Sequence, residues 1–162
     1  MKKIISVLLL LIVFISCRES STDKPTNAEN DNAGTPPETV ALYFINGYVD
    51  NSNKLDEGIS MTEFVDASPY VTSDFKSELK RIVQDADPES GLDADPVVDA
   101  QDYPDEFEVE SFDKNTGYAV LKGRDWEAFK LSMVLKQVNQ KWLVNGCGMV
   151  NIPPQQRQPR DF

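Results

Sequence analysis

Acidic side chains between positions 85 and 105 form the densest group of chemically active residues in the chain. Two near-identical stretches, Asp85-Ala86-Asp87-Pro88 and Asp93-Ala94-Asp95-Pro96, follow one another there. Calcium takes about six to eight oxygen ligands, and clustered carboxylates supply them. The residues that would ligate such a cation are Asp85, Asp87, Glu89, Asp93 and Asp95.

The acidic loop departs from the EF-hand, the calcium loop with the best-defined sequence pattern. Counted from Asp85, the sixth residue is Ser90 where the pattern requires Gly, and the twelfth is Pro96 where it requires Glu. A calcium site of another kind is one alternative. Aspartates also cap turns without any ligand, and we favour that interpretation. We therefore expect no metal and no other cofactor.

The residue types that are missing exclude several kinds of chemistry. The 162 residues include no histidine and only two cysteines. Histidine is the most frequent general base and metal ligand, so histidine-based triads and zinc sites are excluded. Without a histidine to activate its thiol, Cys147 is expected to be a small buried apolar residue. An intermolecular disulfide through Cys147 is the alternative.

The first residues have the features of an export signal. Lys2 and Lys3 precede an apolar run from Ile4 to Ile15, and Ser16 lies directly before Cys17. A basic start, a short apolar stretch and a small residue before the cut are typical of a secretory signal peptide. The run is too short to cross a bilayer of about 30 Å as a helix. Residues 1–16 are thus predicted to be a signal peptide.

The segment Phe14-Ile15-Ser16-Cys17 resembles the lipobox of bacterial lipoproteins. The resemblance implies that Cys17 is lipidated, becomes the mature N-terminus and holds the protein at the bacterial cell envelope, with the membrane as its partner. Arg18 favours the outer membrane, by analogy with lipoprotein sorting. Residues 17–34 contain no large apolar side chain, so we expect a flexible tether between the lipid and the folded part.

The balance of charges limits the possible partners. The chain has 16 basic and 27 acidic residues, a formal net charge of −11 at pH 7. Such a surface repels phosphate backbones, so nucleic-acid binding is not expected. It suits a basic protein or a small-molecule ligand, although acidity also serves solubility alone.

After the tether, apolar residues recur at the spacing that is typical of helices. Thr35-Pro36-Pro37-Glu38 has the pattern of a capping box before a helix that runs to about Asp50. Ser60-Met61-Thr62-Glu63 repeats the pattern before a short helix, and a third helix begins near Thr72 or Ser73. The residues expected on the buried faces of these helices are Val40, Tyr43, Phe44, Tyr48, Phe64, Phe75, Leu79, Ile82 and Val83.

After the acidic loop, apolar and polar residues alternate as in strands. Phe107, Val109 and Ser111 alternate with glutamates, which is typical of a half-exposed strand. The later elements are expected to be a turn at 113–117, a strand at 118–121, a strand with Leu131, Met133 and Leu135, a turn at Asn139-Gln140 and a strand at 141–146. The sequence therefore predicts one α+β domain over residues 35–152, with N-terminal helices packed on a curved antiparallel sheet, and a flexible tail over residues 153–162.

This order of elements resembles the nuclear transport factor 2-like superfamily, a cone-shaped fold whose helices and bent sheet often enclose a pocket. The segment from Asp95 to Pro104 resembles a motif of uncharacterised bacterial envelope lipoproteins, and Lys141-Trp142-Leu143-Val144-Asn145 matches the last strand of that family. The resemblance covers about residues 36–152. It implies a fold without an activity, because the family has none established.

Enzymes of the resembled fold, such as ketosteroid isomerases, place an Asp base and a Tyr or protonated Asp donor in an apolar cavity. The resemblance offers Asp99, Asp102 and Tyr103 for these roles. Structural roles are the alternative that we favour, with Asp102 holding backbone groups before the first strand. Tyr48 and Trp126 lie near polar breaks, where lining a cavity mouth is the alternative to a place in the core.

Three functions agree with these features. We rank first a non-enzymatic binding or interaction module, anchored by lipid, with an unknown ligand. An inhibitor or immunity protein against a basic cell-wall-targeting enzyme comes second, because opposite charge speeds capture. A small enzyme that uses the acidic cluster comes third.

Overall fold

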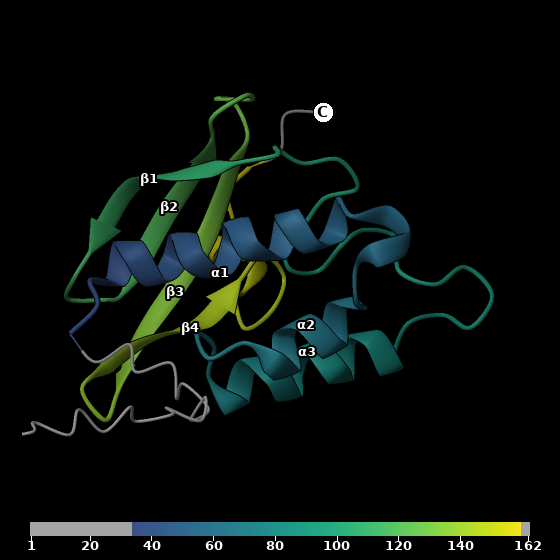
Figure 1. The fold of residues 1–162 in the computed structure, drawn as a ribbon, viewed down its shortest axis with the longest axis horizontal. Helices are drawn as coiled ribbons and strands as arrows, with labels where there is room; N and C mark the ends of the chain where they lie inside the picture. Colours follow the sequence, from purple (N-terminus) through teal and green to yellow (C-terminus); the bar gives the residue numbers. More distant parts are fainter. Residues whose placement is uncertain (1–33, 160–162) are drawn as a thin grey trace, which may run out of the picture.

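The three α-helices precede all four strands along the described part of the chain (Figure 1). The computed structural model describes residues 34–159. Three helices pack on a four-stranded antiparallel sheet, so the predicted α+β class is confirmed. The elements are α1 (Pro37–Ser52), η1 (Leu55–Glu57), α2 (Met61–Ala67), α3 (Ser73–Gln84), β1 (Phe107–Asp113), β2 (Tyr118–Gly123), β3 (Lys130–Val138), β4 (Lys141–Cys147) and η2 (Pro154–Gln156).

The sheet is a meander in which each strand pairs with the next, in the order β1-β2-β3-β4. It is not strongly curled. Asn139 and Gln140 both have positive φ angles, 49° and 66°, which gives the tight turn whose twist matches the strands that it joins. A bulge between Val109 and Ser111 interrupts the predicted alternation in β1. Because of this extra residue, Ser111 is exposed and Phe112 packs against the core.

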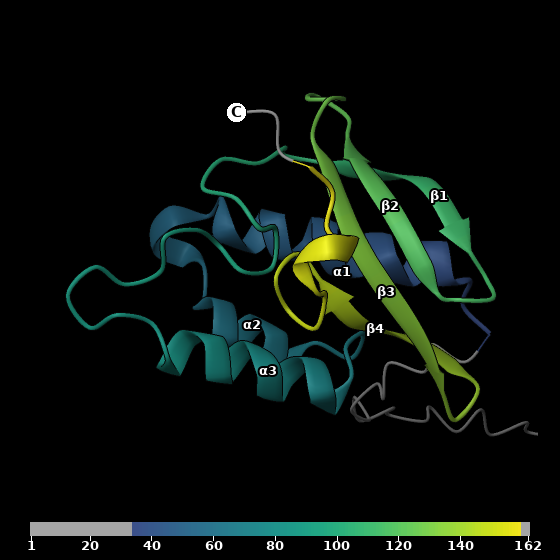
Figure 2. The same cartoon turned by 180° about the vertical axis from the view of Figure 1, so that it is seen from behind.

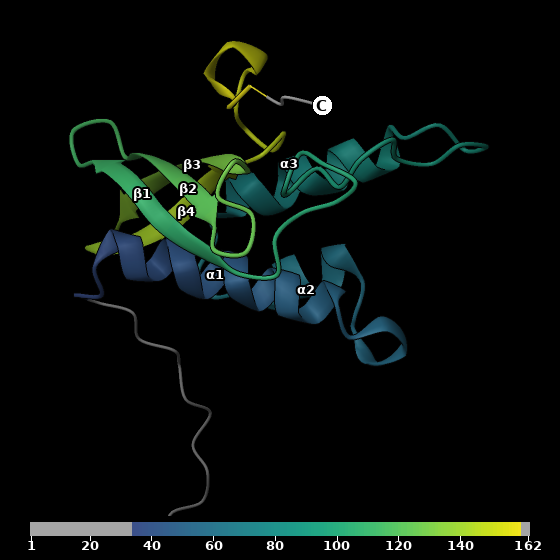
Figure 3. The ribbon, with the colours of Figure 1, turned by 90° about the horizontal axis from the view of Figure 1, so that it is seen from above.

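Helix α1 lies across one face of the sheet, and the space between them is filled (Figures 1 and 3). The α1 residues with no exposed surface are Val40, Ala41, Phe44, Ile45, Tyr48 and Val49. They meet side chains of alternate strand positions, including Leu131, Met133 and Leu135. Tyr43 was expected in this core and is 56% exposed, since it lies outside the buried arc of the helix. Its ring contacts that of Tyr70, with centroids 5.6 Å apart.

Two of the three predicted helix starts are correct. Ser60 and Glu63 form the capping box of α2, and the Thr72 hydroxyl accepts a hydrogen bond from the Phe75 amide at the start of α3. The capping box at Thr35 is wrong. Helix α1 begins at Pro37, its cap residue is Pro36, and no side chain bonds to its first turn. Val83, predicted on the buried face of α3, is exposed at the end of that helix.

Helices α2 and α3 lie side by side next to the edge strand β4 (Figures 1 and 2). The link between them forms a parallel bridge from Val71 to Val144. The Val144 amide donates to the Tyr70 carbonyl at 2.8 Å, and the Thr72 amide donates to the Val144 carbonyl at 3.0 Å. This link covers the outer edge of β4 at that point.

The direction of α1 is fixed by two asparagine side chains. The Asn46 amide group both donates to the Phe107 carbonyl, at 3.1 Å, and accepts from the Phe107 amide, at 2.8 Å. Asn53 donates to the Asp105 carboxylate at 3.0 Å. The C-terminal half of α1 therefore lies beside the start of β1, and its N-terminus lies at the end of the sheet where the β1–β2 and β3–β4 turns are (Figure 1).

The outer face of the sheet carries paired charges and part of the expected tail. Lys122 pairs with Glu108 at 2.9 Å, and Lys130 pairs with Glu110. The carbonyl of Gln156, in η2, accepts hydrogen bonds from the Tyr118 hydroxyl at 2.7 Å and from the buried Ser132 hydroxyl at 3.0 Å. Figure 2 shows η2 in front of the sheet. Residues 153–159, expected to be flexible, are thus held against this face.

Gly148 follows β4 at a point where a side chain has no room. Its φ is 58°, and an added Cβ would lie 2.5 Å from the Val97 carbonyl oxygen. Its amide donates to the Ser132 carbonyl at 3.1 Å, and the next amide, of Met149, donates to the Pro96 carbonyl at 2.8 Å. The chain after β4 is therefore pressed against the loop at residues 96–97.

We expect Gly148→Ala to lower the free energy of unfolding by more than about 2 kcal/mol, because it adds a backbone clash to an unfavourable φ. Gly91→Ala is the matched control. Its φ is 73°, but an added Cβ meets nothing within 4 Å, so it should cost about 1 kcal/mol. Urea unfolding of both variants measures the difference, and equal losses would contradict the tight contact at Gly148.

Candidate functional site

The connection from α3 to β1 extends away from the sheet and then returns to it (Figure 3). It contains both acidic stretches, and the sequence repeat is also a structural repeat. In each copy an aspartate before a proline accepts hydrogen bonds from the amides two and three residues later. Each carboxylate therefore closes a turn of its own backbone.

The first copy is built on Asp87. Its Oδ1 accepts from the Glu89 and Ser90 amides, both at 2.8 Å, and its carbonyl accepts from the Gly91 amide at 2.8 Å. These hydrogen bonds, first those of Ser90 and then Glu89, hold the pKa of the Asp87 carboxyl below its usual range. The tip of this turn is exposed to solvent.

The second copy is built on Asp95. Its Oδ1 accepts from the Val97 amide at 2.8 Å and from the Val98 amide at 3.4 Å. Its carbonyl accepts from the Asp99 amide at 2.7 Å, and Asp99 has a positive φ of 55°, as Gly91 has in the first copy. Here Val97 and Val98 are fully buried, so this turn forms part of the core.

A hydrogen bond joins the second turn to α1. The hydroxyl of Tyr48, which is fully buried, donates to Oδ2 of Asp95 at 2.5 Å. Burial raises the pKa of the Asp95 carboxyl, and the hydrogen bonds from Tyr48 and Val97 oppose this effect. Burial, followed by the Asp95 charge, raises the pKa of Tyr48 far above its ordinary value. The pKa of Tyr103 is also raised, mainly by burial.

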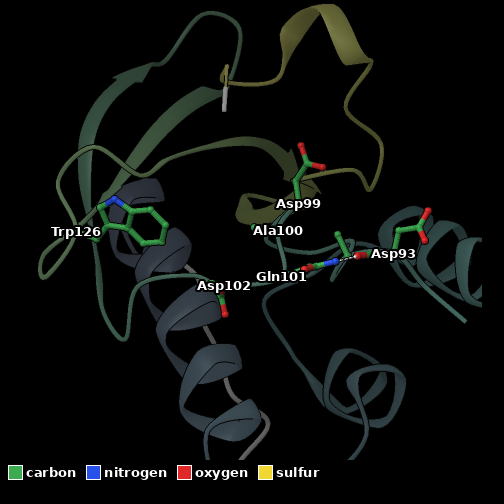
Figure 4. Close-up of a pocket in the computed structure, with 7 residues that line it drawn as sticks. Asp93, Asp99, Ala100, Gln101, Asp102 and Trp126 are labelled. Atoms are coloured by element: carbon green, nitrogen blue, oxygen red, sulfur yellow. Dashed lines mark hydrogen bonds between the residues drawn. The ribbon is translucent and has the colours of Figure 1, made fainter. Parts of the chain in front are cut away.

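A pocket of about 520 Å³ lies on the outer side of this turn (Figure 4). The β2–β3 connection supplies its aromatic wall, Trp126, whose surface is 46% exposed. The Trp126 ring packs on that of Phe129, with centroids 5.2 Å apart. The Gln101 side chain donates to the Asp93 carbonyl at 2.7 Å, which joins two of the lining residues. The lining residues are Asp93, Ala94, Asp99, Ala100, Gln101, Asp102 and Trp126.

The three residues offered for catalysis are only partly brought together. Asp99 and Asp102 both line the pocket, but their carboxylates point in different directions (Figure 4). Tyr103 does not line it and packs, half-buried, against the core. An acid and a base that act on one substrate atom must both reach it, and this arrangement does not aim the two carboxylates at a common point.

The candidate metal ligands are engaged elsewhere or lie apart. Asp85 pairs with Arg81 at 2.7 Å, while Asp87 and Asp95 bind backbone amides. Glu89 is at the exposed tip, and Asp93 lines the pocket. Within residues 34–159 no three His, Cys, Asp or Glu side chains are grouped so that they could hold a metal ion.

Sequence reasoning found some parts of the site and missed others. Trp126 lines the pocket, which was the alternative to a place in the core, whereas Tyr48 is fully buried in the core. The Tyr48–Asp95 hydrogen bond and the positions of Asp93 and Gln101 in the pocket were not foreseen. The repeated Asp-Pro pattern was the available signal, because a second copy with two valines in place of Glu89 and Ser90 indicates a buried turn.

Of the two cysteines, Cys147 is fully buried at the end of β4. Cys17 lies outside the described residues, as do the predicted signal peptide and nearly all of the predicted tether. None of the helices within residues 34–159 has the length and apolar character needed to span a membrane.

Comparison with models of known protein families, with curated proteins and with solved structures finds no significant match for this chain.

The half-buried Asp95, whose pKa is raised, should make the domain less stable as pH rises. A carboxyl whose pKa is higher in the folded state than in the unfolded state binds more protons in the folded state. The stability that it contributes is therefore lost as pH rises from 3.8, its ordinary pKa, through the raised pKa of the folded state. Asp95→Asn removes this titration and keeps an acceptor for the Val97 amide. The free energy of unfolding of the native chain should therefore fall relative to Asp95→Asn as pH rises from about 4.

Chemical denaturation of both proteins between pH 3.5 and pH 7, in steps of about half a unit, measures this difference. Asp87→Asn is the control with the opposite sign, because the pKa of Asp87 is lowered: the native chain should gain stability relative to this variant as pH rises. A constant difference between the native chain and Asp95→Asn would contradict the raised pKa.

Proposed function

We propose that this chain is a lipid-anchored protein of the bacterial envelope, and that its folded domain is a non-enzymatic binding module. The pocket beside Trp126 receives a positively charged group of the ligand. The observation that carries this proposal is the composition of the pocket, in which Asp93, Asp99 and Asp102 accompany a half-exposed indole ring.

The charge around the pocket supports a cationic ligand. Residues 82–106, which connect α3 to β1 and supply most of the pocket lining, include nine acidic side chains and no basic one. A cation that enters this pocket therefore meets a negative potential from several directions. The face of a tryptophan ring attracts ammonium and guanidinium groups, within about 6 Å of its centre. A lysine or arginine side chain of a protein, or a small organic cation, has this chemistry.

Binding suits the geometry better than catalysis. The interior between α1 and the sheet is filled by side chains such as Phe44 and Met133, so the pocket is on the surface. Asp99 and Asp102 diverge, which spreads negative charge over the pocket wall instead of concentrating it on one reacting atom (Figure 4). The small-enzyme alternative has less support for this reason.

The relation to the nuclear transport factor 2-like superfamily belongs to this proposal. The succession of helices and antiparallel meander supports it, and so does the placement of α1 across one face of the sheet. Because the sheet is weakly curled and the interior is filled, the proposed cone would be a closed one. A closed cone favours recognition at the surface.

Inhibition of a basic cell-wall-targeting enzyme is the second candidate. The run of acidic side chains over residues 82–106 favours it, because complementary charge accelerates the encounter of two proteins. Capture of a basic hydrolase from an envelope extract, lost at high salt, would support the inhibitor function over small-ligand binding.

We expect trilysine to change the emission of Trp126 in a saturable manner, measured in the Trp142→Phe background so that only one indole reports. Replacing Asp99 and Asp102 by Asn should weaken this binding by about tenfold, because two carboxylates of the pocket lose their charge. Asp56→Asn with Glu57→Gln, in η1, is the matched control and should leave the affinity within about twofold.

The same titration with trilysine acetylated at all four amino groups tests the requirement for charge and should give no saturable signal. Equal binding of the charged and acetylated peptides would contradict a cation site, as would equal affinities of the pocket double variant and the η1 control.

The lipid anchor has its own test. We expect Cys17→Ser to move the protein from the membrane fraction to the soluble fraction and to block incorporation of labelled palmitate, because serine offers no thiol for acylation. Cys147→Ser is the control and should stay with the membranes. Recovery of unmodified full-length native chain from the cytosol would contradict the anchor.

A further inference from the structure

A second, smaller pocket adjoins the one beside Trp126. It has a volume of about 300 Å³, and Asp93 and Ala94 line both pockets. We call the larger one the Trp126 pocket and the smaller one the Leu92 pocket. Asp93 and Trp126 lie on opposite sides of the Trp126 pocket, so the Leu92 pocket begins on the side away from the indole ring (Figure 4). The other residues that line the Leu92 pocket are Ala86, Asp87, Ser90, Gly91, Leu92 and Met149.

The Leu92 pocket offers mainly apolar contact. Leu92 is 36% exposed although its side chain is large and apolar, and Met149 is half-buried. The carboxylate of Asp87 already accepts hydrogen bonds from the Glu89 amide and from the amide and hydroxyl of Ser90. An apolar side chain placed here would remove the exposed surface of Leu92 and Met149 from water, which is favourable.

Neighbouring basic side chains make the two pockets differ in their preference for a cation. Arg157 donates to the Met149 carbonyl at 3.4 Å and to the Ile152 carbonyl at 2.9 Å, so a positive charge lies beside the Leu92 pocket. Arg124, which precedes Trp126 by two residues, pairs with Glu106 at 2.8 Å. A cation is therefore favoured in the Trp126 pocket more than in the Leu92 pocket.

Hydrogen bonds hold the residues around both pockets before any ligand binds. The Gln101 side chain donates to the carbonyl of Asp93, on the border between the pockets, at 2.7 Å. The Met149 amide donates to the Pro96 carbonyl at 2.8 Å, which keeps the far wall of the Leu92 pocket against the loop. A site that is formed in advance loses less conformational entropy when its ligand binds.

Two adjoining pockets of different chemistry match an extended polypeptide better than a small cation. A small organic cation in the Trp126 pocket leaves Leu92 and Met149 exposed. Alternate side chains of an extended chain point to the same side and are about 7 Å apart. The long stem of a lysine or arginine side chain extends this reach towards Trp126.

We infer that the two pockets together bind an extended segment of a basic protein. A lysine or arginine side chain lies beside Trp126, and an apolar side chain two positions away along the segment lies against Leu92 and Met149. This inference rests on the cation site proposed above, and it specifies a polypeptide as the ligand of that site.

Three peptides test the second contact through the emission of Trp126, in the Trp142→Phe protein. The first, acetyl-Leu-Ser-Lys-Ser-Leu-amide, has leucine two positions from lysine on both sides, so it suits either chain direction. It should bind about fivefold more tightly than acetyl-Ser-Ser-Lys-Ser-Ser-amide, because a leucine side chain leaves water. The third, with glutamine in place of lysine in the first, should bind at least about tenfold more weakly than the first, because it has no charge.

Replacing Leu92 isolates the smaller pocket. Leu92→Ser should remove the gain given by leucine and leave the affinity for the serine peptide within about twofold, because Leu92 does not line the Trp126 pocket. Ile59→Ser is the matched control. Ile59 is also an apolar residue of a connecting segment, is 49% exposed and lines neither pocket, so this variant should keep the gain.

The last three residues of the chain, Arg160-Asp161-Phe162, have the same spacing of a cation and an apolar side chain and lie outside the described residues. A chain that ends at Pro159 should bind the leucine peptide within about twofold of the full chain, because an external segment is the ligand. A gain of more than about fivefold on this truncation would identify the chain's own C-terminus as the occupant and would overturn the inference.

Equal affinities for the leucine and serine peptides, or a gain that survives Leu92→Ser, would also overturn the inference while leaving the cation site in place. Absence of saturable binding by both lysine peptides would contradict the cation site itself, and the inference with it.

Discussion

The half-buried carboxylate of Asp95 accepts the hydrogen bonds on which the arrangement of this domain depends. It accepts hydrogen bonds from the Tyr48 hydroxyl in α1 and from the amides of Val97 and Val98 in its own turn. A buried charge is costly unless it is bonded in this way. One group thereby joins the longest helix to the loop that forms the pocket wall, and the two valines complete the core.

The same short motif serves two purposes in consecutive copies. In the first, Asp87 closes a turn whose tip is in solvent, and in the second, Asp95 closes a turn whose tip is buried. The difference arises from two substitutions, Glu89 and Ser90 against Val97 and Val98. Asp87 and Asp95, two of the residues that suggest a cation site in the sequence, therefore bind backbone amides instead. Asp93 and Asp99 line the surface pocket.

Most of the fold was predictable because it is encoded locally. The capping box at Ser60, the turn at Asn139-Gln140 and the alternation in β3 each depend on a few adjacent residues. The wrong predictions also have local causes, such as the bulge after Val109, which interrupts the predicted alternation in β1. The site was less predictable, because the partners Tyr48 and Asp95 are 47 residues apart and their contact follows from packing.

The side-chain amide of Asn46 has a further consequence, for contacts between copies of the domain. It occupies the outward N–H and C=O of Phe107, at the start of an edge strand, and the bulge beside Glu110 distorts the middle of that strand. Residues 70–72 cover the opposite edge. Neighbouring copies of the domain would thus find few free strand edges with which to polymerise.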